Sequence, residues 1–149
     1  MIAQITDLFE FRARGATRTE RPVSTLAFDW IYTGLLSLFT IGFMMDVWSH
    51  STFGPDQSVF NEYHLLFYSA VTMMAVVLVG SHFRNVGVGY RFANALPQGY
   101  GFALCGVLGF GLAGGLDLIG HATFGFENTE EALLSPTHLG MFITWAALS

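Results

Sequence analysis

The stretch GYGFALCGVLGFGLAGGLDLI at residues 99–119 decides the fold, because Asp117 is its only charged side chain. A helix needs about 20 predominantly apolar residues to cross the hydrocarbon core of a bilayer. Two further stretches of the same character precede it, at about 23–45 and 63–81. The sequence therefore predicts an all-α integral membrane protein with at least three spanning helices.

The composition of the chain supports a lipid environment. Hydrophobic residues make up 52% of the chain and charged residues only 11%, whereas a soluble domain usually has about 25% charged residues. The chain has no clustered basic surface of the kind that nucleic-acid-binding proteins carry. Its single cysteine, Cys105, falls inside the third apolar stretch, which excludes a disulfide framework. We expect the lipid bilayer as the main partner and no nucleic acid.

The apolar stretches are expected to pair into two helical hairpins of the same orientation, related as parallel repeats by an axis along the membrane normal. The last stretch runs from about His138 to Ser149 and is too short to span. Either the natural chain continues past Ser149 or this segment is a half-helix, and we expect that the helix is truncated. The predicted segments are an N-terminal cytoplasmic or interfacial part (1–22), the first hairpin (23–81), a cytoplasmic linker (82–98) and the incomplete second hairpin (99–149).

The arginines set the predicted orientation, because the chain contains no lysine. Four precede the first stretch and two lie between the second and third: Arg12, Arg14, Arg18, Arg21, Arg84 and Arg91. By the positive-inside rule the N-terminus and the linker are cytoplasmic. The turns predicted at about 46–62 and 120–137 hold no basic residue and are expected outside, in the periplasm of a Gram-negative cell. These features predict a multi-pass protein of the inner membrane.

One polar motif occurs twice, and each copy is followed by a further histidine. An aspartate and a histidine four residues apart lie on one face of a helix. Within a hairpin the returning helix lies about 8–10 Å away, so its first histidine comes within reach of that face. The two copies are Asp46-Val-Trp-Ser-His50-Ser-Thr-Phe-Gly with His64, and Asp117-Leu-Ile-Gly-His121-Ala-Thr-Phe-Gly with His138.

A carboxylate with two imidazoles is a ligand set for a transition metal, and copper or zinc is the ion we expect. The second copy is the stronger candidate, because Ser135 and Pro136 predict a helix start just before its last histidine. The predicted ligands are Asp117, His121 and His138 for the stronger site, and Asp46, His50 and His64 for a weaker one. Four acidic residues are candidates for assisting roles: Glu62, Glu127, Glu130 and Glu131.

The segment Asp117-x3-His121 … Leu134-Ser-Pro-Thr-His138 resembles the metal motif in the C subunit of the copper membrane monooxygenases, which act on methane and ammonia. In that family an Asp, a His four residues on, and a later His after a Pro-containing turn hold a metal near the outer membrane face. The resemblance covers residues 117–138 and implies Asp117, His121 and His138 as ligands. The two histidines lie closer together in the family than here, so the resemblance implies a related kind of site and not the monooxygenase reaction.

Three functions remain open from the sequence. The leading one is a membrane protein that binds one or two transition-metal ions at its periplasmic face, for catalysis, transport or structure. If it is an enzyme, we expect a metal-dependent membrane oxidoreductase. The second is a non-catalytic subunit that packs within a larger membrane complex or a homo-oligomer, for which glycines such as Gly111 and Gly115 would allow close helix contacts. The third, tetrapyrrole binding, is weakened because only His82 lies away from the predicted outer face.

Overall fold

The protein was analysed as a computed structural model, which describes residues 20–54, 61–124 and 134–148. Throughout these ranges the secondary structure is helical and no strand occurs, which confirms the predicted all-α fold class. The N-terminal segment up to residue 19, and with it most of the predicted interfacial part, lies outside the described residues. The helices are α2 (Leu26–Phe53), α3 (Glu62–Gly87), the short 3₁₀ helix η1 (Phe92–Asn94), α4 (Tyr100–Phe124) and α5 (Pro136–Ala146).

Helices α2, α3 and α4 are each long and apolar enough to cross a membrane, as predicted. They extend further than the apolar stretches, and the prediction that the outer turns begin at about 46 and 120 is wrong. Helix α2 ends only where Gly54 adopts a φ of 88°, a conformation that favours glycine. Before that point Ser51 and Thr52 donate hydrogen bonds to carbonyl groups one turn back, so polar residues continue the helix. The Asp and His of each motif therefore lie within a helix, as their spacing of four residues predicts.

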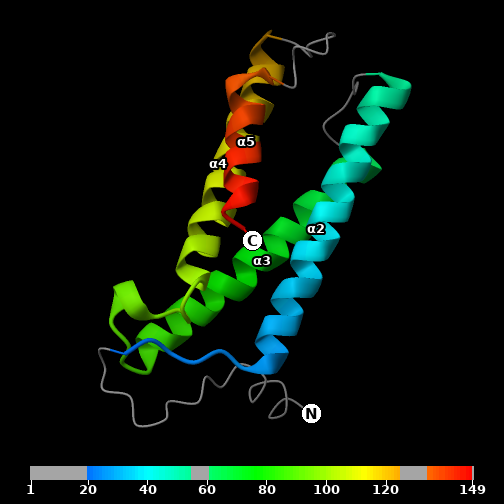
Figure 1. Cartoon of the computed structure of the whole chain (residues 1–149). Coiled ribbons are helices and arrows are strands. Elements are labelled where there is room, and N and C mark those ends of the chain that lie inside the picture. Colours follow the sequence, from blue (N-terminus) through cyan, green and yellow to red (C-terminus); the bar gives the residue numbers. More distant parts are fainter. Residues whose placement is uncertain (1–19, 55–60, 125–133, 149) are drawn as a thin grey trace.

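The helices form two hairpins, α2 with α3 and α4 with α5, and the hairpins meet where α3 contacts α4 (Figure 1). The last turns of α2 and α4 and the first turns of α3 and α5 lie at one end of the bundle. The connection between α3 and α4 lies at the opposite end. There the Arg21 guanidinium donates a hydrogen bond to the Leu96 carbonyl over 3.4 Å, which joins the segment before α2 to that connection.

Aromatic side chains from the four long elements form one continuous core cluster. Phe39 of α2 is edge-on to Phe110 of α4, with ring centroids 5.0 Å apart, and edge-on to Phe67 of α3 at 6.2 Å. Phe43 of α2 reaches Trp145 of α5 at 5.4 Å. Such ring pairs contribute about 0.5–1.5 kcal/mol each beyond the burial of their area. The cluster packs the two hairpins against each other along the middle of the bundle.

Two glycines of the glycine-rich helix α4 allow α5 to lie close against it. A Cβ on Gly106 would lie 2.9 Å from the Ala147 carbonyl carbon, and one on Gly109 would lie 2.6 Å from Thr144 Cγ2. In the described structure a Cβ on Gly111 or on Gly115 would have no atom within 4 Å. Helix α5 thus packs on the face of α4 that carries Gly106 and Gly109, and the expectation that Gly111 and Gly115 allow close contacts with another subunit stays a prediction.

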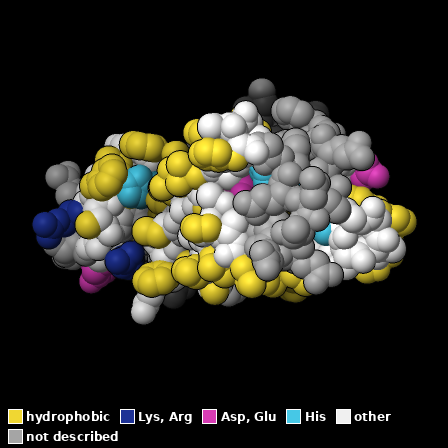
Figure 2. Space-filling model, turned by 90° about the horizontal axis from the view of Figure 1, so that it is seen from above, with side chains coloured by type: hydrophobic (Ala, Val, Ile, Leu, Met, Phe, Trp, Pro, Cys, Tyr) yellow, Lys and Arg dark blue, Asp and Glu magenta, His cyan; other side chains and the backbone are white. Residues whose placement is uncertain are grey.

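Polar contacts join the hairpins at the end that lies away from the Asp/His motifs. The Tyr100 hydroxyl of α4 donates to Asp29 Oδ1 of α2 over 2.7 Å, and Ser24 donates to Asp29 Oδ2 over 3.1 Å. The buried Tyr32 hydroxyl donates to the Leu148 carbonyl over 2.8 Å. Viewed from above, arginine side chains gather at one end of the molecule and hydrophobic side chains cover much of the described surface (Figure 2).

Candidate metal centre

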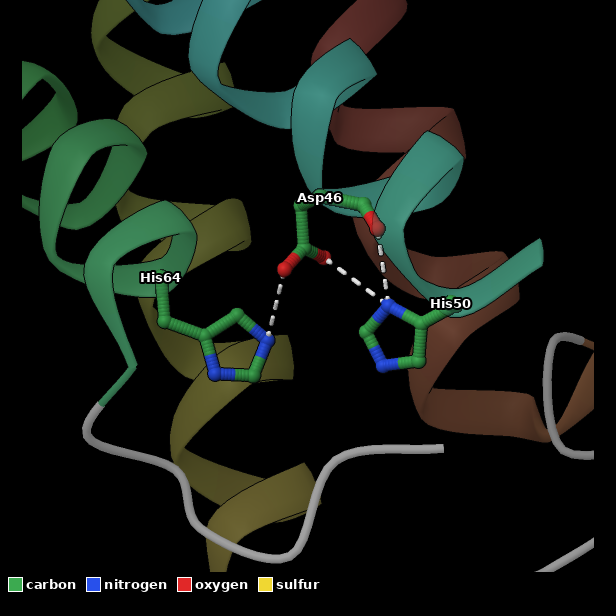
Figure 3. A group of neighbouring side chains, drawn as sticks. All are labelled: Asp46, His50 and His64. Atoms are coloured by element: carbon green, nitrogen blue, oxygen red, sulfur yellow. Dashed lines mark hydrogen bonds and ion pairs between the residues drawn. The ribbon is translucent and has the colours of Figure 1, made fainter. Parts of the chain in front are cut away.

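Asp46 and His50, near the end of α2, and His64, in the first turn of α3, point toward one another (Figure 3). Asp46 Oδ1 lies 3.2 Å from His64 Nε2, and Asp46 Oδ2 lies 3.8 Å from His50 Nδ1. One ligand atom from each residue can be chosen so that all three lie within 4.8 Å of one another. Asp46 itself is only 7% exposed. The structure thus brings together the whole set that the first copy of the motif predicts, and this group could hold a metal ion.

The local structure of each helix explains why these side chains meet. Helix α3 begins after Asn61, whose side-chain oxygen accepts a 2.7 Å hydrogen bond from the His64 backbone N–H. This cap places His64 in the first turn, opposite α2. On α2, His50 Nδ1 donates a 2.8 Å hydrogen bond to the Asp46 carbonyl. The cap of α3 and this hydrogen bond on α2 thus orient the two imidazole rings toward the Asp46 side chain.

The Asp46 carboxylate is buried without full hydrogen bonding. Its Oδ1 atom lies 3.2 Å from His64 Nε2, and no other polar partner among the described residues is recorded for it. Arg21, Arg84 and Arg91 are the basic residues of the described chain, and they belong to the opposite end of the bundle. A buried carboxylate is costly unless a cation or several donors compensate it. A metal ion between the three side chains would supply that compensation.

Asp117, His121 and His138 form the matching group in the second hairpin. Asp117 Oδ2 lies 3.2 Å from His121 Nε2, and Asp117 Oδ1 lies 3.4 Å from His138 Nδ1. The two imidazole rings are 6.3 Å apart between centroids. Among the described residues, only Asp46, His50 and His64 bring three ligand atoms within 4.8 Å of one another. The ligand atoms of Asp46, His50 and His64 thus lie closer together than those of the second hairpin. The expectation that the second copy binds the metal more strongly stays a prediction.

The predicted start of α5 is confirmed, and it organises the second group. Ser135 is the N-cap and Pro136 opens the helix. The Ser135 hydroxyl is 2.8 Å from His138 Nδ1, and the Thr137 hydroxyl donates a 2.6 Å hydrogen bond to Asp117 Oδ1. Asp117 is thus held by a hydroxyl group of α5, a contact that has no counterpart among the hydrogen bonds of Asp46 in the described chain.

Two residues that organise these groups, Asn61 and Thr137, are not among those predicted from the sequence. Asn61 stands three residues before His64, the same spacing that separates Ser135 from His138, so this cap was visible in the sequence. Thr137 gave no such signal, because its role depends on how α5 lies against α4. Among the four candidate assisting residues, Glu62 is exposed at the start of α3 and its role remains a prediction. The other three, Glu127, Glu130 and Glu131, lie outside the described residues.

His82, the fifth histidine, lies far from both groups, near the other end of α3. It is buried, and its ring is edge-on to Phe92 with centroids 4.5 Å apart. No second histidine of the described chain lies beside it in sequence or on its helix turn.

Comparisons with protein-family models, with curated proteins and with solved structures found no match for the chain. The class of this protein therefore follows from its fold and its site alone. The chain is an all-α protein with three helices able to span a membrane and an Asp-His-His group that could hold a metal ion.

Proposed function

We propose that this chain is a multi-pass membrane protein that binds one transition-metal ion, copper or zinc, at each of its two Asp/His groups. The observation that carries the proposal is the convergence of His50 and His64 on the buried carboxylate of Asp46. Asp117, His121 and His138 repeat the same chemistry in the second hairpin. The resemblance of this second set to the C subunit of the copper membrane monooxygenases supports the choice of ligands there.

The first group fits such an ion after a small adjustment. Nitrogen and oxygen ligands lie about 2.0–2.2 Å from zinc, so two ligands of a tetrahedral site are roughly 3.4 Å apart. Starting from a spread of 4.8 Å, the widest pair must approach by roughly 1.4 Å, which side-chain rotation can supply. Three protein ligands leave a coordination position open, as catalytic sites do. A metal-dependent membrane oxidoreductase is the enzyme that this arrangement would serve.

We place the groups at the periplasmic face of the inner membrane, with the N-terminus in the cytoplasm. The positive-inside rule supports this orientation, since the described arginines and the two Asp/His groups belong to opposite ends of the bundle. The alternative function, a non-catalytic subunit of a larger membrane complex or homo-oligomer, requires no bound metal. Metal content therefore separates the two proposals.

The test is elemental analysis of the full chain purified in detergent without chelators. We expect stoichiometric copper or zinc, with the loss of one ion in His50→Ala and of one ion in His121→Ala. His82→Ala is the matched control, since this histidine lies at the other end of the bundle, and it should retain all the metal. A wild-type protein without stoichiometric metal would refute the function. Metal retained in full by both site variants would refute the ligand assignment.

A further inference from the structure

Tyr68 of α3 lies between the two Asp/His groups. It follows His64 by one helical turn, and the two rings meet edge to face with centroids 5.9 Å apart. On its other side the Tyr68 ring is 6.4 Å from that of Phe110 on α4. Its side chain is half-buried. Tyr68 therefore contacts a predicted ligand of the first group while it faces the second hairpin.

The Tyr68 hydroxyl group extends into the second hairpin. A Cβ on Gly114 of α4 would lie only 3.0 Å from the hydroxyl oxygen. Gly114 precedes Asp117 by one helical turn and shares its helix face. The hydroxyl therefore lies against the face of α4 that carries Asp117, while the ring packs on His64. One phenol group thus links the residues of both groups.

We propose that Tyr68 is a positioning residue shared by the two groups, through which an ion bound at the first group raises the affinity of the second group for its own ion. The inference rests on the proposed function. An ion at the first group fixes His64, and the fixed imidazole restricts the Tyr68 ring that packs on it. The hydroxyl is then held over Gly114 as a hydrogen-bond donor toward Asp117, whose carboxylate can accept several hydrogen bonds.

The sign of the coupling follows from the cost of ordering the Tyr68 side chain. If the first ion has already ordered that side chain, the second ion binds without this cost, and affinity rises. Repulsion between the two cations acts in the opposite direction, but each cation is bound to a carboxylate that offsets part of its charge. Couplings between distinct binding sites are typically about 5- to 150-fold and are reciprocal. We expect at least about five-fold here.

The test is a double-mutant cycle on the affinity of the second group for Zn(II), measured by competition with a chelating dye on the full chain in lipid nanodiscs. The binding step that Asp117→Asn abolishes identifies the second group. We expect His50→Ala and Tyr68→Phe each to weaken this step about five-fold or more. The double variant should be no weaker than Tyr68→Phe alone. Effects that simply multiply in the double variant, or a second step unchanged in His50→Ala, would overturn the coupling.

A second pair of variants displaces Tyr68 without altering its chemistry. Gly114→Ala places a methyl group against the hydroxyl and should reproduce the loss seen in Tyr68→Phe. Gly115→Ala, whose Cβ would meet no atom within 4 Å, is the matched control and should bind like wild type. Equal affinities in these two alanine variants would also overturn the coupling. Failure of wild type to bind any Zn(II) would instead overturn the proposed function, so the two failures are distinguishable.

Discussion

Replacing Gly106 with alanine should separate α5 from α4, and the structure gives the size of the effect. The new Cβ would lie 2.9 Å from the carbonyl carbon and 3.1 Å from the carbonyl oxygen of Ala147. These are backbone atoms, so no side-chain rotation relieves the contact. Overpacking of this kind costs about 1–3 kcal/mol, while the change from glycine to alanine within a helix returns about 0.5–1 kcal/mol.

Gly111→Ala is the matched control, because a Cβ on Gly111 would have no neighbour within 4 Å. It keeps the gain in helix propensity without the overpacking. The difference in the free energy of unfolding between Gly106→Ala and Gly111→Ala should therefore be about 1–3 kcal/mol, with Gly106→Ala the less stable.

The assay is equilibrium unfolding in mixed micelles with increasing dodecyl sulfate, followed by far-UV circular dichroism. Movement of α5 also shifts His138 relative to Asp117, so Gly106→Ala should weaken the second metal group and spare the first. A Gly106→Ala protein as stable as Gly111→Ala would refute the packing of α5 on this face of α4.

Three other outcomes are expected. Tyr32→Phe removes the hydroxyl that donates to the buried Leu148 carbonyl and should lower the free energy of unfolding by about 1–3 kcal/mol in the same micelle assay; an unchanged value would contradict that contact. Asn61→Ala removes the cap that accepts from the His64 N–H. It should cost about 0.5–2 kcal/mol and reduce metal affinity at the first group in dye competition, whereas Ser51→Ala, which alters an exposed hydroxyl bonded only within α2, should change neither. Removal of metal by a chelator should lower the thermal midpoint, since an ion at 100 times its Kd stabilises the folded state by about 2.7 kcal/mol per site; a midpoint that does not return on adding Zn(II) would speak against the sites.

The three long helices were predictable because a helix that crosses a bilayer needs about 20 consecutive, predominantly apolar residues. Apolar length identified α2, α3 and α4, and Ser135 with Pro136 identified the start of α5. The helix ends were harder to predict, since polar residues near Asp46 suggested a turn. In the structure their hydroxyl groups bond within the helix, which continues to Gly54.

The composition of each Asp/His group was also predictable, because a spacing of four residues on a helix and a returning histidine are local features. The residues that support the groups were less accessible. The hydrogen bond from Thr137 to Asp117 depends on the contact between α4 and α5, and the position of Tyr68 depends on the contact between α3 and α4. The glycines that meet α5 could not be singled out for the same reason, since the sequence does not say which face of α4 meets α5.

The most direct test of a metal-binding role is anomalous diffraction from crystals of the full chain, recorded at the absorption edges of zinc and copper. The account predicts one anomalous peak among Asp46, His50 and His64 and another among Asp117, His121 and His138, with ligand distances of about 2.0–2.2 Å. Ordered side chains at both groups without an anomalous peak, in protein supplied with zinc and copper, would contradict it.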